Sequence, residues 1–270
     1  LTATQRSILA PQAYEAQFDD WNLSGNINLA YALTPDVLAY VTYAKSFKSG
    51  GINLSGLPLD AQNNPILAAS TVEPEDVNHY EAGLKTQFLD RKATVNLAAF
   101  WSVVQEYQAT VTNGQLGVIR GYLANAEEVQ VRGVEADFAI RPVDGLNLYV
   151  NAAYTDHEYT SFPDAPCPPE LAGGTMASTT NPASPPGTPG GFSPANCDIS
   201  GQWLPGISKW AFSWGAQYDH PANFFGRDGA VYLGYEGNYR SVFSSTASRA
   251  IYTDIPAYAV SNFRLGFRVE

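Results

Sequence analysis

The sequence predicts an all-β protein, an antiparallel β-barrel that crosses a membrane with its strands. Apolar and polar residues alternate with a period of two over most of the chain, and only a β-strand turns that pattern into two chemically different faces. The alternating segments run to roughly ten residues or more, the length a tilted strand needs to span a bilayer. Short and long connections also alternate along the chain, as they do on the two sides of an outer-membrane barrel.

Composition excludes several other classes of protein. The chain has 270 residues, with 15 Lys and Arg against 26 Asp and Glu, and 13% of its residues are aromatic. This acidic balance excludes a nucleic-acid partner, because phosphate backbones attract basic surfaces. Disordered chains are rich in charge and poor in aromatics, so disorder is excluded too. No apolar run approaches the ~18 residues of a transmembrane helix, whereas barrel strands leave little trace in average hydropathy.

The first predicted strand, Asn22 to Leu33, alternates strictly over its whole length. Its odd positions are mostly large and apolar, Leu23 and Ile27 among them, and its even positions are small or polar. Thr34-Pro35-Asp36 then supplies the turn chemistry that ends it. The next strand, Val37 to Lys48, is apolar on both faces. That pattern suits a strand whose inner face also meets protein.

Later segments continue the alternation and bring the expected total to about nine strands. They are predicted at 77–89, 92–112, 117–141, 146–154, 210–219, 231–240 and 262–269. Within 117–141 the pattern changes phase, because Val129 and Val131 stand on odd positions and Val134 and Phe138 on even ones. A β-bulge at Arg132-Gly133 would produce this change.

Connection lengths assign the two ends of the barrel. Short connections are expected at 34–36, 90–91 and 142–145, and one of moderate length at 220–229. Long connections, rich in Gly, Pro, Ser and Asn, are expected at 49–76, 156–206 and 241–255. Each strand reverses direction, so the short connections gather at one end and the long ones at the other. Complete bacterial barrels have an even number of strands, so we expect residues 1–270 to be one portion of a larger barrel.

Several phrases of the sequence, in order along the chain, resemble the C-terminal half of the barrel of TonB-dependent outer-membrane receptors, so we expect residues 1–270 to be a C-terminal portion of such a barrel. Residues 43–53 read YAKSFKSGGIN and are similar to that family's Y-x-x-G-F-K-S-G-G-F-N strand end, with Ser46 and Ile52 as departures. The other matching phrases are 73–75 with 80–85 (EPE, YEAGLK), 98–108, 125–126 with 133–135 (NA, GVE) and 204–210. Together they cover nearly the whole chain from Trp21 onward.

The resemblance implies a bacterial outer-membrane barrel of about 22 strands, of which these would be about the twelfth to the twentieth. An N-terminal plug and the segment that binds the TonB complex would lie outside this sequence. The implied function is import of a scarce small molecule, such as a ferric siderophore, haem, cobalamin or an oligosaccharide, with energy from TonB. The lipid bilayer and the TonB complex are the implied partners, and no cofactor is implied.

Two other functions share the alternating pattern. A passive porin would have the same strands without a plug, and a secreted β protein that binds carbohydrate would bury its apolar rows in a water-soluble core. An upstream globular segment of ~150 residues would favour the receptor over the porin. Solubility of the complete protein without detergent would favour the secreted protein.

The sequence predicts no catalytic or metal-binding residues, and we expect the protein not to be an enzyme. It contains no G-x-S-x-G motif. Asp156-His157-Glu158 could suggest a metal site, but consecutive strand residues point to opposite faces, so we expect a solvated rim there. His79 and His220 have no metal-ligand spacing beside them.

Polar residues of the alternating strands are expected to face the wet interior of the barrel. There they would hydrate it and contact the plug, and a few would contact the imported molecule. The candidates are Glu81, Lys85, Asn96, Glu135, Asn151, Gln217, Glu236 and Arg264.

Cys167 and Cys197, both in the Pro-rich connection 156–206, are the only cysteines. An exported protein passes through an oxidising periplasm, so we predict a disulfide between them. Closing about 30 residues restricts the unfolded connection by roughly 3–4 kcal/mol in the chain-entropy model.

Overall fold

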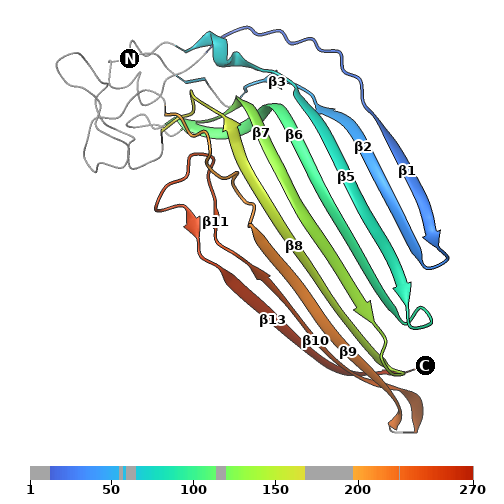
Figure 1. Ribbon diagram of the computed structural model, residues 1–270. Coiled ribbons are helices and arrows are strands. Elements are labelled where there is room, and N and C mark those ends of the chain that lie inside the picture. The colour runs from blue at the N-terminus through green and yellow to red at the C-terminus, as the bar shows by residue number, and fades with distance from the viewer. Residues whose placement is uncertain are drawn as a thin grey trace.

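The fold is one antiparallel sheet of nine strands, seen in a computed structural model that describes residues 13–54, 57–58, 65–113, 120–167, 197–224 and 226–269 (Figure 1). Every strand pairs with its neighbour in the chain, which confirms the predicted all-β antiparallel architecture. The strands are β1 (Gly25–Thr34), β2 (Val37–Lys48), β5 (Glu75–Phe88), β6 (Ala93–Asn113), β7 (Arg120–Ile140), β8 (Leu146–Ser161), β9 (Trp210–Phe224), β10 (Arg227–Arg240) and β13 (Tyr258–Val269). The sheet curves as part of an open barrel. Its edge strands are β1 and β13, each of which pairs with one neighbour within the described residues.

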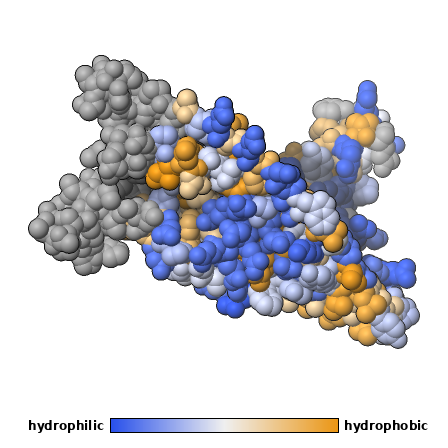
Figure 2. Space-filling model, turned by 90° about the horizontal axis from the view of Figure 1, so that it is seen from above, coloured by the Kyte–Doolittle hydropathy of each residue, from blue (hydrophilic) through white to orange (hydrophobic). Residues whose placement is uncertain are grey.

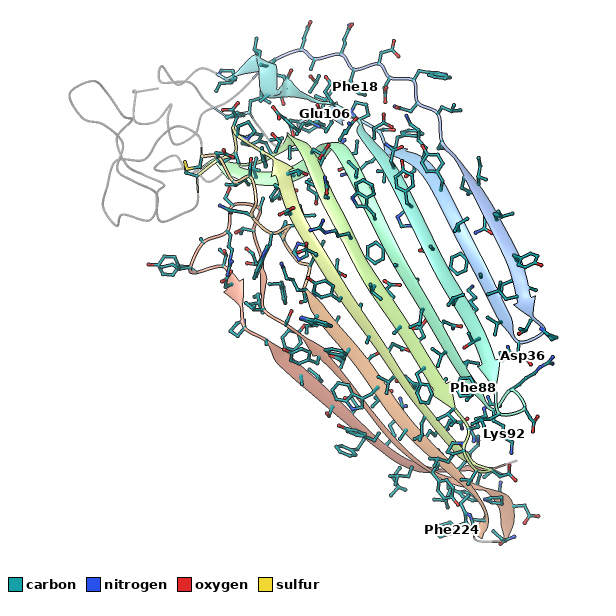
Figure 3. The ribbon with its side chains drawn as sticks, in the orientation of Figure 1. Phe18, Asp36, Phe88, Lys92, Glu106 and Phe224 are labelled. Carbon is teal, nitrogen blue, oxygen red and sulfur yellow. A yellow bond between two sulfur atoms is a disulfide. The ribbon has the colours of Figure 1, made fainter. Side chains whose placement is uncertain are left out.

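Short turns and long connections lie at opposite ends of the sheet. In Figure 3, Asp36, Phe88, Lys92 and Phe224 mark the short-turn end, and Phe18 and Glu106 mark the other. The long connections carry five small elements, which are β3 (Gly51–Ile52), η1 (Leu67–Ser70), β4 (Thr71–Val72), β11 (Phe243–Ser244) and β12 (Asp254–Ile255). Among the described residues, no helix is both long and apolar enough to cross a membrane.

Two connections are shorter than the sequence predicted, because the strands beside them run further. The moderate connection expected at 220–229 is mostly strand, since β9 ends at Phe224 and β10 begins at Arg227. Pro221 fits there because Tyr218 is the last residue of β9 that pairs with β8, so a missing N–H breaks no ladder bond with β8. The long connection expected from 156 begins only after Ser161, because the end of β8 pairs with β7 on one side and with Gly201 and Gln202 on the other.

The predicted bulge at Arg132-Gly133 is wrong. β6 pairs with β7 through this point without a shift in register, and the irregularity between β7 and β8 lies at Glu128/Val129 instead. The change of phase has another cause. Val134 and Phe138 are exposed on one face of β7, whereas Val129 lies buried on the opposite face, beneath the long connections. The two faces exchange polarity along the strand because their surroundings change.

The two faces of the sheet differ in chemistry along most of its length. One carries exposed large apolar side chains, among them Ile27, Phe263 and Leu265, with exposed fractions of 72%, 76% and 75%. The other is polar, and the middle of the face visible in Figure 2 is largely hydrophilic. Buried apolar residues instead gather at the long-connection end, in a cluster around Tyr159, Ile199 and Leu204. The sheet itself therefore has no second layer against which to bury its apolar face within the described residues.

Candidate functional site

The candidate site is the polar face of the sheet, here called the inner wall, and the long connections at its rim. The pairing register places all eight candidate residues on this one face, which are Glu81, Lys85, Asn96, Glu135, Asn151, Gln217, Glu236 and Arg264. Strand alternation explains the result, because the residues keep one parity on each strand.

A continuous polar belt crosses six strands of the inner wall. Its members are direct cross-strand neighbours, namely Lys85, Asn96, Asp137, Asn151, Ser213 and Asn238. Within it, the Asn151 side-chain amide donates to Ser213 Oγ at 3.1 Å. Asp137 was not among the predicted residues, although it stands two positions after Glu135 on the same strand and so shares its face. The belt offers donors and acceptors to water or to a polar molecule.

Charged side chains of the inner wall fall into paired and unpaired groups. The Arg264 guanidinium binds both carboxylate oxygens of Glu236, at 3.3 and 3.1 Å, and Arg268 lies 2.8 Å from Asp219. The carboxylates of Glu135 and Asp137 form neither a hydrogen bond nor an ion pair with any described residue. They are therefore free to meet a cationic group from outside this chain.

One cluster joins β2, β5 and β6 on the inner wall toward the rim. The Tyr40 hydroxyl donates to Glu81 Oε1 at 2.7 Å, and the Tyr40 ring lies so close over Gly83 that a Cβ there would come within 2.6 Å of it. His79 Nδ1 lies 2.8 Å from Ser102 Oγ, and its Nε2 lies 3.6 Å from Glu81 Oε2. This cluster was not predicted from the sequence, because its members come together only through strand pairing.

The rim differs from the solvated edge expected at Asp156-His157-Glu158. His157 is buried, with 1% of its surface exposed, and its Nδ1 accepts the backbone N–H of Leu204 at 3.0 Å. Asp156 lies on the opposite face and binds both Lys209, at 2.8 Å, and Arg132, at 2.9 Å. Consecutive residues do point to opposite faces, but the face of His157 is covered by the connection between β8 and β9.

Trp203 links the two long connections nearest the C-terminal strands. The Lys209 ammonium and the Arg249 guanidinium lie over its ring, at 5.2 and 4.3 Å from the centroid. Arg249 also binds both oxygens of Asp254, at 2.9 and 2.6 Å. This hydrogen-bonded guanidinium holds the pKa of the Asp254 carboxyl below its usual range. The connection between β8 and β9 and the one between β10 and β13 thus form one packed unit.

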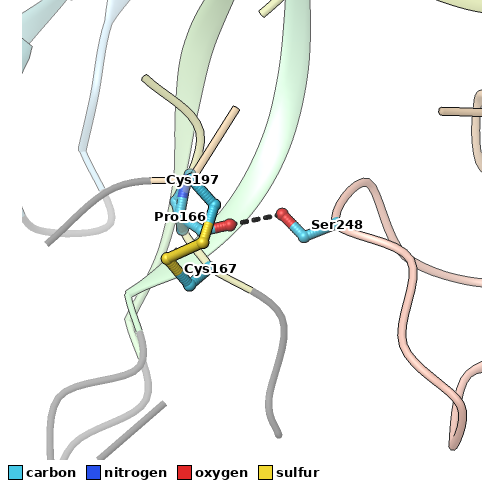
Figure 4. The surroundings of a disulfide bond; sticks show 4 residues. All are labelled: Pro166, Cys167, Cys197 and Ser248. Atoms are coloured by element: carbon cyan, nitrogen blue, oxygen red, sulfur yellow. Dashed lines mark hydrogen bonds between the residues drawn. A yellow bond between two sulfur atoms is a disulfide. The ribbon is translucent and has the colours of Figure 1, made fainter. Parts of the chain in front are cut away.

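A disulfide joins Cys167 and Cys197 in this unit (Figure 4). The backbones of Ala165 and Cys197 also exchange two hydrogen bonds, of 2.8 and 3.1 Å. Ser248, from the connection between β10 and β13, donates a hydrogen bond to the Pro166 carbonyl. The disulfide therefore lies beside the contact between the two connections.

Comparison with known proteins gives one family match over nearly the whole chain. The family model described as "TonB dependent receptor-like, beta-barrel" matches residues 3–270. The metal-pseudopaline receptor CntO of Pseudomonas aeruginosa is 29% identical over 135 residues, which are 50% of this chain and 16% of that receptor. The ferric-pyoverdine 358 receptor of Pseudomonas putida is 25% identical over 133 residues, which are 48% of this chain and 14% of that receptor.

Solved structures share the fold at low sequence identity. The ferric yersiniabactin uptake receptor FyuA of Yersinia pestis superposes with a TM-score of 0.60 at 17% identity, covering 92% of this chain and 30% of that one. The ferric preacinetobactin receptor BauA of Acinetobacter baumannii gives 0.58 at 15% identity, covering 92% and 29%. The chain thus spans less than a third of either structure.

Proposed function

This chain belongs to the TonB-dependent receptor β-barrel family, and from that premise we propose that it forms part of the barrel wall of a bacterial outer-membrane importer. The cargo is a metal chelate, and the energy for its passage comes through TonB. The single observation that carries the proposal is the separation of the nine-stranded sheet into an exposed apolar face and a polar inner wall.

The apolar face has the properties of a lipid-contacting surface. Exposing apolar side chains to water costs about 25 cal/mol per Å², and acyl chains remove that cost. Where this face ends toward the long connections, Tyr43, Tyr80 and Trp101 stand side by side on neighbouring strands, with ring centroids 5.2 and 5.7 Å apart. Aromatic rows of this kind mark the membrane–water boundary of barrels.

The inner wall has the properties of a passage that also holds a plug. The polar belt around Asn96 and Asn151 would keep the interior hydrated. Glu135 and Asp137 lack described partners, and a basic side chain of a plug domain elsewhere in the receptor would pair with them. The names of the relatives, which are receptors for metal-pseudopaline and ferric siderophores, support a metal chelate as the cargo of this receptor.

Labelling of single cysteines tests the two faces. Ile27 and Asn28 are adjacent in β1, and their side chains lie on opposite faces. In isolated outer membranes, N28C of the full receptor should react with a water-soluble maleimide, and I27C should resist it. Equal reaction of both would refute the membrane orientation.

Uptake measurements test the transport itself. Cells that lack the receptor should lose accumulation of one radiolabelled metal chelate, and removal of TonB should abolish it equally. Accumulation that continues without TonB would indicate a passive channel, and no loss of any metal chelate would refute the proposed cargo.

A further inference from the structure

Two side chains of β5, His79 and Glu81, form a donor pair on the inner wall. They are two residues apart on one strand, so both point to the same face. Each is about one third exposed, with side-chain fractions of 31% and 30%. A molecule inside the barrel can therefore reach both.

The distance between their donor atoms fits one metal ion. His79 Nε2 and Glu81 Oε2 are 3.6 Å apart, which is longer than a hydrogen bond of about 2.7–3.2 Å. Bonds from a transition metal to imidazole nitrogen and carboxylate oxygen measure about 2.0–2.2 Å. Two such bonds that meet at about 120° hold their donor atoms about 3.6 Å apart. At this separation a single ion can lie within bonding distance of both atoms.

Neighbouring strands fix the orientation of both side chains. Ser102 Oγ lies 2.8 Å from His79 Nδ1. When Nδ1–H donates to this hydroxyl, the Nε2 lone pair is available to bind a metal. The ring also stacks on Phe100, with centroids 6.3 Å apart. Tyr40 binds Glu81 Oε1 at 2.7 Å and leaves Oε2 open. Metal ligands in proteins are characteristically held by outer hydrogen bonds of this kind.

The pair is an incomplete site, and this determines the kind of ligand. Of the described side chains, no group of three or more His, Cys, Asp or Glu could enclose an ion. In the site proposed below, the remaining donors come from the bound molecule. Imidazole favours zinc, copper, nickel and iron over magnesium and calcium.

We propose that His79 and Glu81 coordinate the metal of the imported chelate directly, filling two positions that the chelator leaves open. This rests on the proposed import function and narrows its cargo to chelates of transition metals with unfilled coordination positions. Ser102 and Tyr40 act as positioning residues for the two ligands.

The test uses the full receptor, purified without a histidine tag, and Cu²⁺–nitrilotriacetate, a chelate with open positions. Electron paramagnetic resonance of the bound copper should show coupling to an imidazole nitrogen. H79A should remove the coupling and weaken binding roughly tenfold or more, and S102A should weaken it roughly tenfold. H220A is the matched control, since His220 lies on β9 away from the pair, and it should bind like the wild type.

Two results would overturn the site, namely binding by H79A equal to that of the wild type, or bound copper with no coupling to an imidazole nitrogen. Heat-modifiable migration on gels verifies that each variant is assembled. H79F keeps a ring against Phe100 and replaces H79A if that variant does not assemble. Transport is scored separately, so a receptor that binds the probe through His79 but imports no metal chelate refutes the proposed function and supports the site.

Discussion

Tyr159 offers a sharp test of how the rim is stabilised. Its side chain is fully buried, with 0% of its surface exposed, and packs on Tyr107 and Phe162 at centroid distances of 6.2 and 5.4 Å. Its hydroxyl has no hydrogen-bond partner among the residues that the structure describes. A buried, unpaired hydroxyl costs about 1–3 kcal/mol. Removing only this oxygen should therefore stabilise the rim or leave it unchanged.

The predicted magnitudes separate the ring from the hydroxyl. Y159F should change the free energy of local opening by about 0 to +2 kcal/mol, whereas Y159A removes the ring and should cost about 3–5 kcal/mol. Each 1.4 kcal/mol changes an opening equilibrium about tenfold. Y159A should thus lower exchange protection by more than about 100-fold, and Y159F should keep or raise it.

Amide hydrogen exchange of the full receptor in nanodiscs is the appropriate assay. The informative amides are Tyr159 and Gly201, because they bond Gln202 O at 2.9 Å and Tyr159 O at 2.7 Å across the rim. Y252F is the control, since Tyr252 is 78% exposed on the neighbouring connection. Tenfold faster exchange in Y159F than in the wild type would refute the reasoning, because it would mean that the hydroxyl has a stabilising partner.

Three further perturbations act on single features of the fold. The double variant C167S/C197S should leave the sheet assembled but release the connection that the disulfide closes. In the chain-entropy model the disulfide stabilises this connection by about 3–4 kcal/mol. Proteolysis of the variant on whole cells should therefore be faster, and an unchanged rate of cleavage would contradict the prediction. Because its partner lowers the pKa of Asp254, the carboxylate stabilises the rim above its unfolded pKa and loses this effect as pH falls through the lower folded pKa. D254N should lower the stability of the rim by less than about 1 kcal/mol at neutral pH, and it should have no effect once the wild-type carboxyl is protonated. Hydrogen exchange measures both. An equal loss of stability at the two pH values would argue against the ion pair. At Gly133 a Cβ would meet a backbone carbonyl at 2.2 Å, whereas at Gly51 nothing lies within 4 Å. G133A should therefore lower the yield of assembled barrel and G51A should not, as heat-modifiable migration would report.

The strands themselves were predictable because their signal is local. Alternation over Asn22 to Leu33 needs only its own residues, and the structure has β1 over most of that segment. The same parity rule predicted that Glu135 and Arg264 share one face. They are 129 positions apart in the sequence, and pairing connects their strands only through β8, β9 and β10. Where a strand keeps one environment on each side, the sequence predicts its faces correctly.

Errors arose where the environment changes along a strand. The phase change near Arg132 was interpreted as a bulge, although the backbone pairs regularly there. The burial of His157 could not be predicted, because it depends on a connection that returns from Leu204, 47 residues later, to bond its ring. The polarity of a side chain matches its surroundings in the folded protein, and the sequence does not indicate where along a strand those surroundings change.

Sequence alone determined the all-β architecture, the order of the strands and the chemistry of the two faces, because period-two patterning and turn residues act over a few positions. Which side chains meet across strands depends instead on the folded sheet. His79 meets Ser102 at a separation of 23 residues, and Tyr40 meets Glu81 at 41. These contacts depend on register, and register is set by pairing along entire strands and by the turns that join them.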